Sequence, residues 1–397
     1  MLEILLYLAI ILLATKLLGD LFARLGQPAV LGKLLAGILV GPAVLGWIHP
    51  NELLSIFSEI GVLLLMFMAG LETDLEQLRK NWKSAFAVAV GGIILPFIGG
   101  YGAASVFGLS NNQGLFLGLL LCATSVSISV QTLKEMDRLN TKEGTTILGA
   151  AVVDDVIVVV LLAVMMSLLG TGHDISLGLL IGKKLLFFVV AIVVGWLAVP
   201  WFLKLFAPLR VTEAVISGAL IVCFALSYFA DLMGVAAIIG AFAAGIAVSQ
   251  TPFKHDVEDR LEPVAYSIFV PVFFVSIGLN ITFEGAANQL LFMGVITVVA
   301  VLTKLLGGGL GAKLTGFNGR SSLAIGSGMI SRGEVALIIA ATGLESGLLQ
   351  QKYFTSVVIV VILTTLITPP LLKMFFSGES ATHRYTKSNM GSSYDDK

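Results

Sequence analysis

The stretch Val152-Val153-Asp154-Asp155-Val156-Ile157 places two adjacent carboxylates inside one long apolar segment, residues 145–169. This segment can cross a bilayer as a helix, because about 20 apolar residues span the hydrocarbon. A charge at bilayer depth costs roughly 2.5–3.5 kcal/mol on insertion scales, so such carboxylates indicate a function. Asp154 follows Thr145 by nine residues, which predicts a depth of about 14 Å at 1.5 Å per residue, near the bilayer midplane.

The composition of the whole chain is that of a membrane protein. Of its 397 residues, 57% are apolar and 12% are charged, whereas about a quarter of a soluble chain is charged. The formal net charge of −1 provides no basic surface for nucleic acid. Cys122 and Cys223 lie in apolar stretches and indicate neither a disulfide framework nor a metal site. We therefore expect a protein that crosses the lipid bilayer many times and binds no nucleic acid.

Thirteen segments are long and apolar enough to cross the membrane as helices. No segment alternates apolar and polar residues as membrane β-strands do, so the predicted fold class is an all-α polytopic membrane protein. The first segment carries Glu3 and lacks a small-residue cleavage site, so we expect it to be retained. The predicted spans are residues 2–23, 29–48, 53–71, 83–107, 114–134, 145–169, 176–206, 212–230, 234–249, 263–279, 290–311, 322–344 and 353–376.

Basic residues in the connecting loops predict the orientation. The odd-numbered loops from the first to the eleventh hold Lys or Arg, whereas loops two, four, eight and ten hold none. Because basic loops stay in the cytoplasm, we expect the amino terminus outside the cell membrane and the carboxyl terminus in the cytoplasm. Lys352 and the pair Lys183–Lys184 do not fit this pattern. The polar tail, residues 377–397, is expected to be disordered.

An internal repeat appears when the sequence is shifted by 208 residues. The motif G-x-x-x-A-G at 32–37 falls on the same motif at 240–245, and further glycines coincide. Each match joins one span to the span seven places later, so the two halves would run in opposite directions. Six spans, a linker span and six more make an inverted repeat, which is typical of secondary transporters; glycine-rich helix packing is the simpler alternative. The other matches are Gly70-Leu71 with Gly278-Leu279, Gly99-Gly100 with Gly307-Gly308, and Gly118 with Gly326.

Lys304 is a third charged residue predicted to lie deep in the membrane. It stands seven residues before the end of its span, about 11 Å from the cytoplasmic side. At that depth it can pair with one aspartate, unless it snorkels to the surface instead. Neighbouring helical residues point about 100° apart, so Asp154 and Asp155 can serve different partners.

The fifth span of each half is interrupted by residues that weaken a helix. Residues 122–129 read C-A-T-S-V-S-I-S, and residues 326–334 read G-S-G-M-I-S-R-G-E. Interrupted helices at matching positions of two repeats are the best sequence indicator of a transport site, since their ends direct dipoles and free carbonyls at an ion. The structural alternatives are hydroxyls bonded to an ordinary helix backbone and mutual neutralisation of Arg332 and Glu334.

A buried carboxylate predicts coupling between a cation and a proton. It is a hard oxygen ligand for a small cation, and away from water it also takes up a proton more readily. If only a loaded site crosses between the two faces, competition at one carboxylate exchanges one ion for the other. No P-loop of the form G-x-x-x-x-G-K-[ST] is present, so an ion gradient is the expected driving force.

Taken together, these stretches resemble the monovalent cation:proton antiporter-2 family, most closely its bacterial electrogenic sodium/proton antiporters with an Asp-Asp motif. The resemblance covers about residues 1–376. It rests on Asp154-Asp155, Lys304, T-S-V-S at 124–127 and S-R-G-E-V-A-L at 331–337, with early motifs at 26–32 and 68–72.

The resemblance implies a homodimer of thirteen-helix protomers with two inverted six-helix repeats and discontinuous crossing helices. A transport core would slide past a fixed dimerisation domain in an elevator-type motion. Residues 1–82 and 212–287 would form the dimerisation domain, 83–175 and 288–376 the core, 176–211 the linker helix and 377–397 the tail.

The resemblance also implies roles for individual residues. Asp155 would bind Na⁺ or H⁺, and Lys304 would pair with Asp154. The cation and proton site would comprise Asp155, Asp154, Thr124, Ser125 and Glu334, and the crossing backbone would comprise Ser127, Ser331, Arg332 and Gly333.

We therefore expect a secondary active antiporter, not an enzyme, that needs no cofactor. Na⁺ is the first candidate cation, with Li⁺ and K⁺ as others. A sodium-coupled symporter of an organic anion is the main alternative, with Arg332 as the anion-binding group. An intramembrane aspartyl protease is disfavoured because adjacent aspartates cannot both face one water; a channel or sensor would lack exchange. Cation selectivity, stoichiometry and the pH set-point are not predicted.

Overall fold

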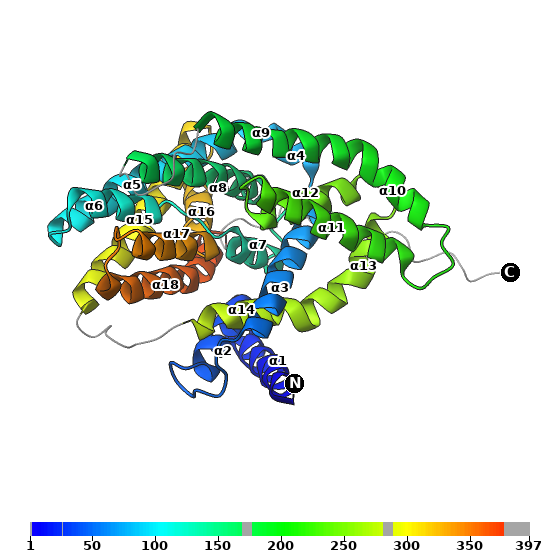
Figure 1. Cartoon of the computed structure of the whole chain (residues 1–397), viewed down its shortest axis with the longest axis horizontal. Helices are drawn as coiled ribbons and strands as arrows, with labels where there is room; N and C mark the ends of the chain where they lie inside the picture. Colours follow the sequence, from blue (N-terminus) through cyan, green and yellow to red (C-terminus); the bar gives the residue numbers. More distant parts are fainter. Residues whose placement is uncertain (1, 26, 169–176, 281–288, 377–397) are drawn as a thin grey trace.

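A computed structural model describes residues 2–25, 27–168, 177–280 and 289–376, and all the regular structure in these ranges is helical (Figure 1). The elements are α1 (Leu2–Arg24), α2 (Ala29–Val40), α3 (Glu52–Glu72), α4 (Leu75–Lys80), α5 (Trp82–Val106), α6 (Asn111–Leu120), α7 (Val126–Glu135), α8 (Lys142–Leu168), α9 (Leu177–Val193), the π-helical η1 (Val194–Ala198), α10 (Val199–Phe206), α11 (Ala214–Leu232), α12 (Ala237–Ser249), α13 (Lys254–Val264), the π-helical η2 (Ala265–Phe269), α14 (Val270–Leu279), α15 (Leu290–Leu314), α16 (Gly319–Gly328), α17 (Glu334–Glu345) and α18 (Gln351–Phe376).

The thirteen predicted spans are confirmed, although four of them are not long continuous helices. Within the described ranges, nine helices are long and apolar enough to cross a membrane, counting those that continue through a π-helical turn. The spans formed by α2 and α12 are short. The fifth span is divided into α6 and α7, and the twelfth into α16 and α17.

The structure corrects two predicted boundaries and adds one short helix. The second helix ends at Val40, because Gly41 caps it in an extended conformation, rather than at residue 48. The tenth helix begins at Lys254, nine residues before the predicted start, because the charged sequence of α13 hides a helix from hydropathy. The short helix α4 was not predicted. Its cap, Asp74, accepts the Gln77 and Glu76 N–H groups at 3.1 and 2.9 Å, and these hydrogen bonds, with that from Gln77 foremost, hold the pKa of Asp74 below its usual range.

The helices pack in two groups, which Figure 1 shows side by side. In one group α1, α2 and α3 pack with α11, α12 and α14, and in the other α5 to α8 pack with α15 to α18. The linker helix α9 contacts both α8 and α12, so it touches both groups. The roles of the groups as dimerisation domain and transport core remain predictions.

The contacts of the glycines confirm the repeat at an offset of 208. Gly32 packs directly against the backbone of Leu18, and Gly240 packs in the same way against Leu226, so both members of the contact are shifted by 208. These recurring contacts show that the two halves have related structures. Because the offset is seven spans, an odd number, the two halves run in opposite directions through the membrane. The other recurring pairs are Gly37–Val275 with Gly245–Phe67, Gly278–Leu34 with Gly70–Phe242, Gly307–Gly91 with Gly99–Val299, and Gly118–Phe97 with Gly326–Leu305.

Helix α15 illustrates how a span divides its faces between lipid and protein. Leu302, Leu306 and Leu310 follow the helical period of four and are 48%, 51% and 55% exposed. On another face, Gly307 packs against the backbone of Gly91 in α5. The exposed apolar stripe fits a lipid-facing surface, and the glycine contact brings α5 and α15 close together.

Candidate functional site

The two broken helices cross at their interruptions. Between α6 and α7 residues 121–125 are not α-helical, and between α16 and α17 the same holds for residues 329–333. The Ser125 N–H donates to the Ser331 carbonyl at 2.7 Å, and Ser331 Oγ donates to the Ser125 carbonyl at 2.7 Å. These two hydrogen bonds join the two halves of the repeat at the crossing.

Gly333 provides the space for this crossing. A Cβ atom at Gly333 would lie 2.6 Å from Ser125 Oγ and 2.7 Å from Ser125 Cβ, far inside van der Waals contact. Glycine is therefore required at position 333 for space. Nearby, Ser129 Oγ donates to the Gly328 carbonyl at 2.5 Å.

Arg332 binds two carbonyl groups in the interruptions, which lack helical partners, and one carbonyl group of α15. Its guanidinium is 1% exposed and donates to the carbonyls of Leu121 at 2.8 Å, Ala300 at 3.0 Å and Ile330. The Arg332 carbonyl accepts from Thr365 Oγ1 at 2.7 Å. The arginine thus brings a buried positive charge to the crossing and links α6, α15 and the α16–α17 interruption.

Lys304 and Asp154 form a buried ion pair next to the crossing. Lys304 Nζ donates to Asp154 Oδ1 at 3.1 Å, and both side chains are 0% exposed. Lys304 is on α15 and Asp154 on α8, so the pair joins one helix of each repeat. Gly92 of α5 leaves room for the ammonium, since a Cβ atom there would lie 3.4 Å from Lys304 Nζ.

Asp155 is the neighbouring carboxylate, and it is 5% exposed. Adjacent helical residues diverge by about 100°, so Asp155 points away from the direction of Asp154. Its carboxylate interacts electrostatically with Lys184 of α9. Lys184 is 3% exposed and donates to the Gly234 carbonyl. It therefore lies inside the protein, which explains why it did not follow the pattern of basic loops.

Several buried polar oxygens at the crossing have unused hydrogen-bonding capacity. The Thr124 hydroxyl faces Asp154, yet among the described residues neither Thr124 Oγ1 nor Asp154 Oδ2 has a hydrogen bond of good geometry. The same is true of Ser127 Oγ. Carboxylate and hydroxyl oxygens suit a small hard cation. The described residues contain no group of three or more His, Cys, Asp or Glu that could hold a metal ion, so hydroxyl and carbonyl oxygens would have to complete the coordination.

The structure brings most of the predicted site residues together at the crossing. The side chain of Glu334, which begins α17, lies outside the part of the chain that the structure describes. Lys184 was not predicted as a site residue, and its only sequence signal was a lysine pair inside an apolar span. The residues placed at or beside the crossing are Thr124, Ser125, Ser127, Asp154, Lys304, Ser331, Arg332 and Gly333.

Known proteins are similar to this chain in sequence and in fold. A family model described as "Sodium/hydrogen exchanger, transmembrane" matches residues 8–378. The chain is 64% identical to the probable Na⁺/H⁺ antiporter GerT of Bacillus cereus, over 93% of this chain and 98% of the relative. It is 60% identical to the Na⁺/H⁺-K⁺ antiporter GerN of the same organism, over 96% and 98%. The solved structure of the sodium proton antiporter MjNhaP1 from Methanocaldococcus jannaschii at pH 8 superposes with a TM-score of 0.63 at 18% identity, over 95% of this chain and 98% of that one; this likeness shows the fold alone.

Proposed function

Because the chain belongs to the sodium/hydrogen exchanger family and is a Na⁺/H⁺ antiporter of the membrane, we propose that Asp155 is the carboxylate that carries Na⁺ and H⁺ in alternation. The observation that supports this choice is the buried pair of Asp154 with Lys304 at 3.1 Å. That pair engages one of the two carboxylates, and the other lies one helical position further on. Thr124, Ser125 and Glu334 would contribute to the cation site.

One carboxylate is enough to couple the two fluxes. A proton on Asp155 removes the negative charge that attracts a cation, and a bound cation disfavours protonation. Exchange follows if the site crosses only when one of the two is bound. Arg332 is engaged by three backbone carbonyls, which disfavours its use as the anion-binding group of a symporter.

We infer that the movement is an elevator-type displacement of one helix group against the other. Residues 83–175 and 288–376 would form the moving core, and residues 1–82 and 212–287 the dimerisation domain, with 176–211 as linker. All the crossing helices belong to the group of α5 to α8 and α15 to α18, so the movement of that group would carry the whole site. The exposed apolar residues of α1, among them Leu5, Leu13 and Leu17, suit a helix that faces lipid or a second protomer.

The finer assignment is also a proposal. A lysine at position 304 resembles the electrogenic members of the monovalent cation:proton antiporter-2 family. The basic loops support an orientation with the amino terminus outside the cell membrane and the carboxyl terminus in the cytoplasm. K⁺ is a second candidate cargo, since the name of GerN includes K⁺.

Transport by the purified protein in proteoliposomes tests the role of Asp155. With an imposed pH gradient and a pH dye, addition of Na⁺ should dissipate the gradient, and parallel additions of Li⁺ and K⁺ define the selectivity. Asp155→Asn should abolish the response, because an amide neither carries a proton nor neutralises a cation. Asp231→Asn, at the exposed end of α11, is the matched control and should transport normally. Undiminished exchange by a folded Asp155→Asn protein would contradict the assignment.

A further inference from the structure

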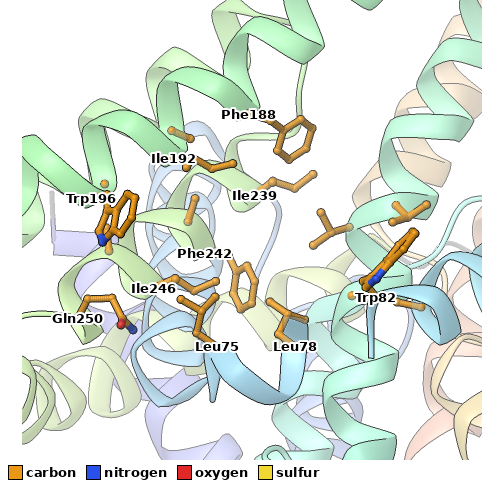
Figure 2. Close-up of a pocket in the computed structure, with 18 of the residues that line it drawn as sticks. Leu75, Leu78, Trp82, Phe188, Ile192, Trp196, Ile239, Phe242, Ile246 and Gln250 are labelled. Carbon is orange, nitrogen blue, oxygen red and sulfur yellow. The ribbon is translucent and has the colours of Figure 1, made fainter. Parts of the chain in front are cut away.

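An apolar crevice of about 550 Å³ opens between the two helix groups. One wall comes from α4, α5 and α8, and the other from α9, η1 and α12 (Figure 2). Figure 2 shows Trp82 and Trp196 on opposite sides, with Leu75 and Leu78 of α4 near Phe242. Gln250 and the two indoles supply the only polar side-chain atoms among the lining residues. The crevice is therefore suited to a hydrocarbon ligand and not to a hydrated ion.

The lining residues are open to the surroundings of the protein. Trp196 is 77% exposed, Ile192 66%, Trp82 61% and Phe86 51%. Exposed large apolar side chains at the rim of a concavity mark a surface that is covered by an apolar partner. Because this rim belongs to membrane-spanning helices, the surrounding solvent is lipid, and tryptophans gather where lipid chains meet headgroups.

A basic cluster follows directly on residues that line the crevice, since Arg79 and Lys80 come after Leu78, and Lys83 comes after Trp82. Arg79, Lys80 and Lys83 are all exposed there. Lys80 is paired with Glu76 at 2.6 Å. Within the described part of the chain no ion pair of this kind engages Arg79 or Lys83, and Lys83 Nζ lies 5.9 Å from the Trp82 ring centre. A hydrocarbon slot whose lining residues Leu78 and Trp82 are each followed by an exposed cation is complementary to a lipid with an anionic headgroup.

We propose that the crevice binds one acyl chain of an anionic phospholipid, whose phosphate lies at Arg79 and Lys83. Helix α4 would contribute to both parts of the site, since Leu75 and Leu78 line the slot and Arg79 follows them. The binding site rests on the structure alone. The crevice lies between the two helix groups that would slide past each other in the proposed function. The bound lipid would then form part of the sliding surface, and this second inference rests on the proposed function.

Photo-crosslinking locates the chain directly. The protein is reconstituted with phosphatidylglycerol that carries a diazirine in one acyl chain, and crosslinked peptides are identified by mass spectrometry. We expect enrichment at Ile192 and Ile246 over Leu306 on the outer face of α15, which reports ordinary lipid contact. The same probe with a phosphatidylcholine headgroup should crosslink at these two residues roughly tenfold less.

Two variants separate the chain from the headgroup. Ala243→Phe fills the slot from α12 and should reduce crosslinking at Ile192 for both lipids, while the yield at Leu306 stays constant. Arg79→Gln with Lys83→Gln should lower the phosphatidylglycerol yield to that of phosphatidylcholine. Lys204→Gln with Arg210→Gln is the charge-matched control and should change neither, because both residues are exposed and neither lines the crevice.

The outcomes decide between occupants. Equal yields for both headgroups in the native protein would overturn the anionic site, and an Ala243→Phe protein that crosslinks normally at Ile192 would overturn the slot. A crosslink to a second copy of the chain at Ile192, in place of lipid, would also overturn the proposal. Na⁺/H⁺ exchange measured on the same samples tests the proposed function separately, because lipid can bind whether or not Asp155 carries the ions.

Discussion

At the scale of single residues, the Asp154–Lys304 ion pair restricts which residues its two positions can hold. Both charges are fully buried and 3.1 Å apart. Such a pair contributes little net stability compared with apolar residues, but the loss of one partner leaves an uncompensated charge in a low-dielectric interior. The pair therefore constrains both positions together.

Lys304→Ala should destabilise the folded protein by about 3–5 kcal/mol, because it leaves the Asp154 carboxylate buried without its counter-charge. Thermal unfolding in detergent measures the effect. Lys313→Ala, on the exposed end of the same helix, should change the midpoint little. The double change Lys304→Ala with Asp154→Ala should recover part of the loss. A Lys304→Ala protein as stable as the native one would contradict the proposed role of the ion pair.

The sequence predicted these charges in part. Counting residues from the ends of two spans brought Asp154 and Lys304 to similar depths, because helical rise is constant. Lys184 could not be assigned in this way. Its partners, Gly234 and Asp155, come from the α11–α12 connection and from α8, and no local pattern reports which side chains meet across a packed interface.

At the scale of elements, the two interrupted helices were predictable, but their mutual contact was not. Glycines and hydroxyls in the middle of apolar spans mark positions where a helix weakens. The hydrogen bonds between Ser125 and Ser331 depend on how α7 and α17 approach in space. Helix α4 was missed because six residues, several of them charged, give too short a signal.

Gly333→Ala should separate the crossing chains, because its new methyl group would meet Ser125 at 2.6–2.7 Å. We expect a loss of about 1–3 kcal/mol in the free energy of unfolding, typical of overpacking, together with slower Na⁺/H⁺ exchange. Thermal unfolding and proteoliposome transport measure the two effects. Gly294→Ala, where nothing lies within 4 Å of the new atom, is the control and should be tolerated; equal behaviour of the two variants would contradict the steric role of Gly333.

At the scale of the whole molecule, ion pairs tie the two helix groups together at one end of α7. Lys134 lies 2.5 Å from Glu72 and 2.9 Å from Glu262, which belong to α3 and α13. The next residue, Glu135, lies 3.2 Å from Lys33 of α2. Any sliding of one group past the other has to break these contacts.

Replacing Glu72 and Glu262 by Gln should loosen this end of the structure. With about 1 kcal/mol lost, amide exchange in the last turn of α7 should accelerate about fivefold. Hydrogen–deuterium exchange with mass spectrometry measures the rate. Asp20→Asn, which breaks a pair with Arg24 inside the single helix α1, is the control. Unchanged exchange around Lys134 would show that these pairs do not hold the groups together.

The repeat does not extend to the charged residues. At the offset of 208, Asp154 and Asp155 correspond to Ile362 and Leu363, and Lys304 corresponds to Pro96. The two halves have a common framework, whereas Asp154 and Asp155 come from the first half and Lys304, the partner of Asp154, comes from the second. The framework was evident from the glycines of the sequence, and the pairing of unlike charges within it required the structure.

The end of α7 departs from the inverted repeat in the same way, since Lys134 and Glu135 correspond to Thr342 and Gly343 at the offset of 208. Two equivalent inverted repeats do not by themselves favour the conformation open to one side of the membrane over the conformation open to the other. The resting preference then has to come from a few side chains that have no counterpart at the opposite face. Substitutions at this end of α7 alone could therefore change which face is open between transport cycles, without altering the side chains of the proposed ion site.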